Sequence, residues 1–195
     1  MSKLKIALIG LVFILPVALS YTLYSLGWRP SGTVNRGELI DPSRSIRDVS
    51  LQTLDGGKIR FHDLRRRWSL IYFGPAECLS PCELNLYKMR QVRLAQGKNA
   101  DRIRRLFIVT DMRALDLLRA TLKEYPGMQV ITGPTENVKT LAAQFTLPVG
   151  SPLDALDRIY VLDPKGNLMM SYPADADPSG MRKDLARLLK VSRIG

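Results

Sequence analysis

The longest uninterrupted run of apolar positions lies near the amino terminus. From Ile6 to Leu26 no residue is charged over 21 positions, which is about the length that a helix needs to cross a bilayer. Lys3 and Lys5 precede this run, and Tyr21 and Tyr24 lie where aromatic side chains favour the membrane interface. The pattern predicts one membrane-spanning helix with its amino terminus on the cytoplasmic side.

A cleaved signal peptide is the alternative interpretation of this run. Ala18, Leu19 and Ser20 place small residues at a separation that suits cleavage. The apolar character continues after Ser20, however, which favours a retained anchor. Pro16 is tolerated inside a membrane helix and predicts only a kink.

The rest of the chain alternates between short apolar runs and helical periodicity. Residues 29–45 show no apolar period and contain Pro and Gly, so they are expected to form a linker between an anchor at 1–28 and a domain at 46–195. Strands within this domain alternate with helices, which predicts a three-layer α/β/α arrangement. Strands or hairpins are predicted at 49–61, 68–74, 105–111, 128–132 and 158–173, and helices at 81–96, 114–125, 135–145 and 179–191.

The chain is strongly basic, with 29 Lys plus Arg against 18 Asp plus Glu and a net charge of +11. Only three of these cations precede residue 30, so the predicted domain is itself basic. Nucleic acid is not expected as a partner, because the chain carries no nucleic-acid motif. Anionic lipid headgroups or an acidic membrane-protein partner fit this charge, and a positive surface that only meets solvent is the alternative.

The only two cysteines, Cys78 and Cys82, lie where a buried strand gives way to a helix. Ser80 with Glu83 three residues later, and Pro81 at the first helical position, predict that a helix begins at Pro81 with Ser80 as its cap. Cys82 is then expected in the first turn and Cys78 in the preceding loop.

These positions allow several kinds of chemistry. The helix amino terminus lowers the pKa of a thiol such as Cys82, whereas the neighbouring Glu77 and Glu83 act in the opposite direction. Cys78, in the loop, is expected to be the more exposed thiol. A redox pair, a site for the soft ion Cu(I), a structural disulfide and two unrelated cysteines all remain open, although a disulfide that closes so small a ring restrains little chain entropy.

Four segments resemble the Sco/SenC family, which are membrane-anchored, thioredoxin-like proteins of cytochrome c oxidase assembly. The resemblance covers roughly residues 46–192, and the three-residue spacer between the cysteines separates the chain from ordinary thioredoxins, whose spacer is two. The four segments that resemble the family are "LIYFGPAECLSPCELNL", "LFIVTDMRALDLLRATLKEY", "VITGPTENVKTLAAQF" and "IYVLDPKGNLMMSYP".

The resemblance implies that Cys78 and Cys82 are candidate Cu(I) ligands, since two cysteines and one histidine hold copper in the family. No histidine occurs in the equivalent stretch of this chain, where Ala155 falls about at the expected position. The single histidine, His62, precedes the first core strand and is expected at a surface or turn. Asp111 matches an acidic position of the family beside the cysteine loop, where it either tunes or binds the ion or caps the next helix.

Two methionines offer a replacement ligand, because thioether sulfur suits Cu(I). Met169 and Met170 are adjacent on a predicted strand and therefore point to opposite faces, so at most one can face the cysteines. Core packing is the expected role of both.

The resemblance further implies a place in cytochrome c oxidase biogenesis, with oxidase subunits or other assembly factors as partners. The chain is expected to be a single-pass protein of a bacterial inner membrane with its domain in the periplasm. It acts either by thiol–disulfide exchange or by Cu(I) delivery through Cys78 and Cys82. The alternative is a redox-inactive assembly scaffold that retains the fold without a complete copper site.

Overall fold

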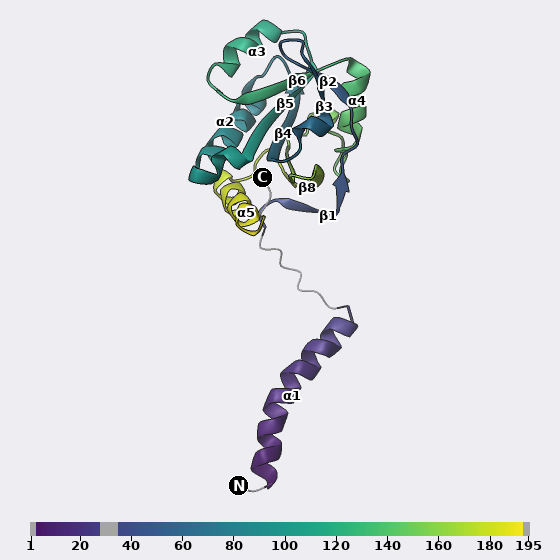
Figure 1. The fold of residues 1–195 in the computed structure, drawn as a ribbon, viewed down its shortest axis with the longest axis vertical. Coiled ribbons are helices and arrows are strands. Elements are labelled where there is room, and N and C mark those ends of the chain that lie inside the picture. Colours follow the sequence, from purple (N-terminus) through teal and green to yellow (C-terminus); the bar gives the residue numbers. More distant parts are fainter. Residues whose placement is uncertain (1–2, 28–34, 193–195) are drawn as a thin grey trace. The chain divides into compact units, whose positions relative to one another are not determined.

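The computed structural model describes residues 3–27 and 35–192, which belong to two compact units, Met1–Val34 and Asn35–Gly195. The first unit contains one helix, α1 (Lys3–Ser25) (Figure 1). Its window Leu8–Ser25 has a mean hydropathy of 1.9, so the helix is long and apolar enough to span a membrane. Residues 28–34, which include the first part of the predicted linker, lie outside the described residues.

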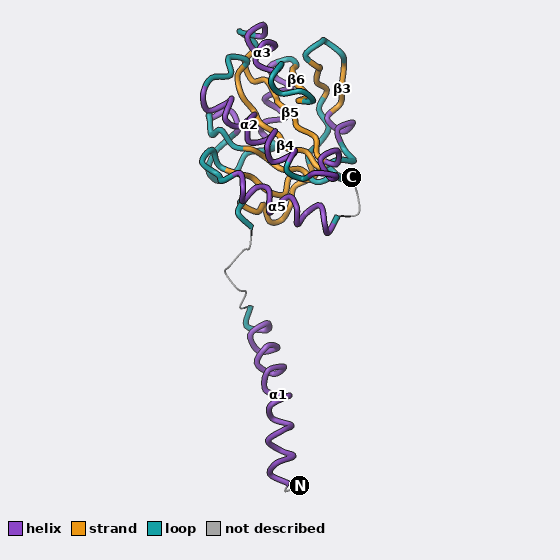
Figure 2. The backbone as a smooth tube through the Cα atoms, turned by 90° about the vertical axis from the view of Figure 1, so that its left-hand side faces the viewer, coloured by secondary structure: helices purple, strands orange, loops and turns teal. Residues whose placement is uncertain are grey.

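The second unit is built on an eight-stranded sheet in the order β1-β8-β7-β4-β5-β6-β2-β3. Figure 2 shows strands β4, β5 and β6 of this sheet in orange. These three central strands run parallel, and every other neighbouring pair is antiparallel. The strands are β1 (Glu38–Ser45), β2 (Ser50–Thr53), β3 (Lys58–Arg60), β4 (Trp68–Pro75), β5 (Ile103–Asp111), β6 (Met128–Thr132), β7 (Ile159–Leu162) and β8 (Asn167–Tyr172).

Helices cover both faces of this sheet, which confirms the predicted mixed α/β fold. One core lies between the sheet and α2 (Ser80–Leu94), α3 (Leu115–Leu122) and α5 (Pro178–Val191). The other lies under α4 (Thr135–Ala143) and the 3-10 helix η1 (Phe61–Leu64). Two further 3-10 helices, η2 (Gly97–Arg102) and η3 (Pro152–Asp154), lie in connections.

The predicted linker is wrong at its carboxyl end, because residues 38–45 form the edge strand β1. It pairs with β8 through Leu39 opposite Met170 and Arg44 opposite Leu168, with an irregularity between these pairs. Almost all of its side chains are exposed. An edge strand that contains Pro and charged residues shows no apolar alternation, which is why its sequence resembles a linker.

The structure also corrects the predicted cap of the helix after the cysteine loop. The cap of α2 is Leu79 instead of Ser80, and the cap of α4 is Pro134. In α5 the side chain of Asp177 accepts hydrogen bonds from the backbone N–H groups of Ser179 and Gly180, so Asp177 is the cap. Each predicted helix exists, and its boundaries differ from the predicted ones by at most three residues, because helix ends depend on local backbone geometry.

Candidate functional site

The cysteines lie at the carboxyl end of the central strand β4, where α2 begins. The backbone N–H of Ala76 donates a 2.8 Å hydrogen bond to the carbonyl oxygen of Asp111, which attaches the cysteine loop to the end of the parallel strand β5. Cys82 is the third residue of α2 and therefore lies in its first turn, as predicted. Crevices outside the carboxyl ends of parallel strands are the common place for functional sites in α/β folds.

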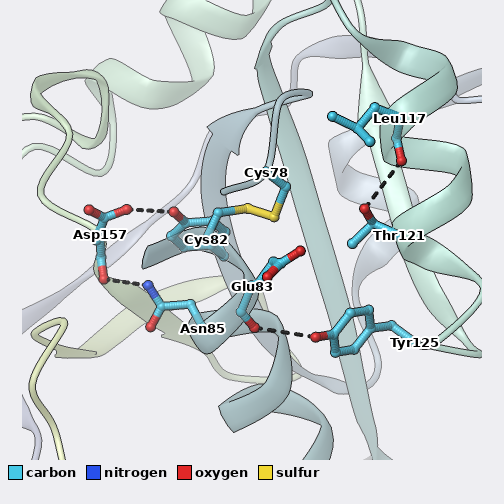
Figure 3. The surroundings of a disulfide bond; sticks show 9 residues. Cys78, Cys82, Glu83, Asn85, Leu117, Thr121, Tyr125 and Asp157 are labelled. Atoms are coloured by element: carbon cyan, nitrogen blue, oxygen red, sulfur yellow. Dashed lines mark hydrogen bonds between the residues drawn. A yellow bond between two sulfur atoms is a disulfide. The ribbon is translucent and has the colours of Figure 1, made fainter. Parts of the chain in front are cut away.

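Cys78 and Cys82 are joined by a disulfide bond, with their Cα atoms 5.1 Å apart (Figure 3). This Cα separation lies within the usual range for disulfides. Cys78 is only 3% exposed and Cys82 only 4%. The expectation that Cys78 is the exposed thiol is therefore wrong, because the loop folds its side chain into the core between the sheet and α2.

A hydrogen-bonded network lies beside the start of α2. Tyr72, a buried residue of β4, donates a 2.6 Å hydrogen bond to Oδ1 of Asp157, and Asn85 donates a 2.9 Å bond to the carbonyl oxygen of the same residue. Figure 3 shows Asp157 and Asn85 on one side of the helix, and Tyr125 with Leu117 of α3 on the other. Burial, together with the bond to Asp157, raises the pKa of Tyr72 far above its ordinary value. Tyr72 therefore remains a protonated donor.

Asp157 is brought to this network by an unusual turn before β7. Ala155 and Asp157 both have positive φ angles, 54° and 48°, in the left-handed region that Asp tolerates better than most residues. The resemblance implies a ligand side chain at about Ala155, but the polar side chain that this turn presents beside α2 is that of Asp157. Asp157 could have been identified from the sequence as an acid within the stretch where a ligand is expected.

The acidic position after β5 is occupied by an ion pair instead of a helix cap. Arg113 donates from Nε and Nη2 to Oδ2 of Asp111, at 2.8 and 2.6 Å, and from its backbone N–H to Oδ1. These bonds from Arg113 hold the pKa of the Asp111 carboxyl below its ordinary value. The cap of α3 is Ala114, without a side-chain bond. Asp111 thus contributes a carbonyl to the cysteine loop and a carboxylate to Arg113.

The remaining candidate ligands do not complete a metal site around the cysteines. His62 is exposed in η1, which packs on the α4 face of the sheet, opposite the cysteine pair. Met170 is fully buried, and a Cβ atom added to Gly37 would lie 2.6 Å from its Sδ atom, so the thioether packs against the start of the domain. Met169 is half-buried against the core.

The copper site that the resemblance implies needs a third ligand beside the two cysteines. Within residues 3–27 and 35–192, no group of three or more His, Cys, Asp or Glu side chains could hold a metal ion. The two sulfurs are bonded to each other, and only reduced thiolates bind Cu(I). The side chains present therefore do not fit a resident three-ligand copper site, and they do fit a dithiol–disulfide couple.

Comparisons with known proteins place the chain in a thioredoxin-like class. It belongs to the family described as transmembrane-like, thioredoxin-like, C-terminal domain, whose model matches residues 68–192. A comparison with curated proteins finds no match.

Solved structures of Sco proteins share this fold. Copper-bound yeast Sco1 is 19% identical, with a TM-score of 0.66 over 78% of this chain and 96% of that chain. BsSco, described as a Sco-family cytochrome c oxidase assembly protein with a disulfide switch, is 16% identical, with a TM-score of 0.58 over 77% and 96%. A thioredoxin domain of a Bacteroides vulgatus thiol–disulfide oxidoreductase is 14% identical, with a TM-score of 0.55 over 74% and 95%. The similarity to Sco structures that the sequence predicted is thus confirmed at the level of the fold.

Proposed function

We propose that this chain is a membrane-anchored, Sco-like protein of cytochrome c oxidase assembly that acts by thiol–disulfide exchange. The observation that carries the proposal is the disulfide between Cys78 and Cys82 at the start of α2, on a thioredoxin-like fold. The role in oxidase assembly rests on the similarity to BsSco and yeast Sco1. Oxidase subunits or other assembly factors that carry a pair of thiols are the corresponding partners.

The exchange proceeds in two steps that transfer two electrons. A partner thiolate attacks Sγ of Cys78, a bond forms between these two sulfurs, and the bond to Cys82 breaks with its electron pair left on Sγ of Cys82. The second partner thiolate then attacks the partner's sulfur in this mixed disulfide, and Cys78 leaves as a thiolate. The partner dithiol becomes a disulfide, the pair in this chain becomes a dithiol, and the reverse sequence reoxidises it.

Cys82 is the better leaving group of the two. Its place in the first turn of α2 exposes it to unpaired backbone N–H groups and to the positive end of the helix dipole, which stabilise a thiolate. A thiol of lower pKa leaves faster, so attack at Cys78 is favoured. Because both cysteines are buried, the attack also requires a local movement that exposes Sγ of Cys78.

Delivery of Cu(I) as cargo is the second candidate function. It is favoured by the similarity to copper-bound yeast Sco1 and by the preference of Cu(I) for thiolates. Two thiolates are available only after reduction of the disulfide, and a third ligand is lacking among the described side chains. Exchange is therefore the function that the site supports best.

The proposed membrane attachment is supported by α1, whose length and composition suit a single span. We infer a bacterial inner membrane with the domain on the periplasmic side, since disulfides persist in oxidising compartments. The lysines before the span agree with a cytoplasmic amino terminus.

One experiment on the full-length chain in detergent micelles separates these functions. The fraction of disulfide is measured in thiol buffers of graded potential, and Cu(I) affinity of the reduced protein is measured by competition. Cys78→Ser and Cys82→Ser remove each sulfur, and Ser80→Ala is the matched control within the same loop. If the protein exchanges disulfides, its two-electron reduction potential should lie between about −270 and −120 mV. Ser80→Ala should not change this potential.

The other outcomes identify the other functions. A potential below about −300 mV is typical of a structural disulfide and contradicts exchange. Tight Cu(I) binding that requires both cysteines supports delivery. If the protein shows neither property and both serine variants still support oxidase assembly in cells, the chain is a redox-inactive scaffold.

A further inference from the structure

The chain enters its folded domain on the surface of α5. The buried carboxylate of Asp184, within this helix, accepts hydrogen bonds from the backbone N–H groups of Arg36 and Gly37, at 2.7 and 2.9 Å. A Cβ atom added to Gly180 would lie 2.8 Å from Cβ of Arg36, so the incoming backbone runs directly against the helix. The covalent connection to α1 therefore reaches the domain at α5.

The solvent-exposed face of α5 is cationic along its length. We call this surface the α5 basic face, formed by Arg182, Lys183, Arg187 and Lys190. The single acid of the helix, Asp184, is buried, and its Oδ1 atom lies 3.9 Å from Nη1 of Arg187. Asp184 therefore offsets part of the charge of Arg187, whereas α5 has no exposed acid beside Arg182, Lys183 and Lys190.

We propose that the α5 basic face docks on anionic lipid headgroups. This inference rests on the proposed membrane anchor, because a covalent anchor keeps the domain of the same chain at high effective concentration near a bilayer. Each Lys or Arg near an anionic bilayer strengthens binding by about fivefold. The attraction acts within a Debye length, so it is expected to weaken steeply as the salt concentration rises.

The test uses full-length protein in lipid nanodiscs of phosphatidylcholine, either alone or mixed with phosphatidylglycerol. Acetylation of Lys183 by a water-soluble reagent is followed by mass spectrometry, with Lys123, exposed at the end of α3, as internal reference. Docking slows the labelling of Lys183 relative to Lys123 only in discs that contain phosphatidylglycerol, and high salt restores it.

A pair of charge-matched variants assigns this effect to the helix. Arg182→Gln with Lys190→Gln removes two charges from the α5 basic face and weakens docking by roughly 30-fold. Lys58→Gln with Lys165→Gln removes two exposed charges from β3 and the β7–β8 turn and leaves the protection of Lys183 unchanged.

Three results overturn the inference. The first is equal labelling of Lys183 in both kinds of disc, and the second is equal loss of protection in both variants. The third is that added polyglutamate slows the acetylation of Lys183 in phosphatidylcholine discs while phosphatidylglycerol does not. This result would identify an acidic polypeptide as the partner.

A separate experiment tests the membrane anchor. If alkaline buffer extracts the chain from phosphatidylcholine discs, α1 does not span the bilayer. In that case the same labelling of Lys183 is measured on phosphatidylglycerol vesicles. Protection there supports the α5 basic face without the anchor, and its absence refutes it.

Discussion

Tyr72 donates a 2.6 Å hydrogen bond to Oδ1 of Asp157, which joins the central strand β4 to the turn before β7. The two residues are 85 positions apart in the sequence. Asn85, one turn after Cys82 in α2, donates to the carbonyl of the same aspartate. The two bonds to Asp157 therefore join three segments near the disulfide: β4, α2 and the turn before β7.

Removing the tyrosine hydroxyl tests how much this bond contributes. We expect Tyr72→Phe to lower the free energy of unfolding by about 1.5–3 kcal/mol, because a hydrogen bond to a charged acceptor is lost. The measurement is urea-induced unfolding of the oxidised protein in micelles. Asp157→Asn retains an acceptor oxygen and should cost less, and an unchanged urea midpoint in Tyr72→Phe would contradict a stabilising role for the bond.

Buried tyrosines predict a loss of stability at alkaline pH. Burial raises the pKa of Tyr160 to about 12, and burial also raises the pKa of Tyr72 and Tyr172. A group whose pKa is higher in the folded state stabilises the fold fully below its unfolded pKa, about 10 for tyrosine, and loses that contribution as the pH rises toward the folded value. Denaturant midpoints should therefore fall as the pH rises above about 10.

The variant Tyr160→Phe measures how much Tyr160 contributes to this loss of stability at alkaline pH. The Tyr160 hydroxyl is buried and has no hydrogen-bond partner among the described residues. Replacing it should be neutral or stabilising by about 1 kcal/mol at pH 7, and it should reduce the loss of stability between about pH 10 and pH 12. A large destabilisation at neutral pH would show that the hydroxyl has a partner after all.

The disulfide is expected to contribute little to stability. Cys78 and Cys82 are four positions apart, and the chain-entropy estimate for so small a ring is about 2 kcal/mol. Guanidinium unfolding with and without reductant measures the difference, and the reduced form of the full-length protein should remain folded. A loss well above this estimate would favour a structural role for the bond over exchange.

Asp184 is predicted to be the most sensitive carboxylate of the domain. Its buried Oδ2 accepts from the backbone of Arg36 and Gly37 and, at 3.1 Å, from the hydroxyl of Tyr172. Asp184→Ala should cost about 3 kcal/mol, because several buried donors lose their partner. The matched control is Asp101→Ala, which removes an exposed carboxylate paired with Arg93 and should cost less than about 1 kcal/mol.

Hydrogen exchange locates the effect of the first variant. Protection should be lost first in β1 and in the amino-terminal half of α5, because Asp184 joins these two elements. Global destabilisation without this preference would contradict a local fastening role.

Much of the fold follows from local patterns in the sequence. The uncharged run of α1, the buried strand β4 and the start of α2 near Pro81 are each specified by residues within one segment. Apolar periodicity and helix-start residues act over a few positions, so they can be recognised without a partner segment. The strand β1 is missed because its side chains are exposed and only its backbone pairs with β8.

The sequence by itself determined the long apolar helix near the amino terminus, the order of the strands and helices after β1, and the position of Cys82 in the first turn of a helix. Only the tertiary structure decided that both cysteines are buried, that Asp157 meets Tyr72, and that Asp184 holds the start of the domain against α5. The physical reason is distance along the chain. Burial and these hydrogen bonds join residues up to 148 positions apart, and such contacts depend on how the helices pack on the sheet instead of on any local pattern.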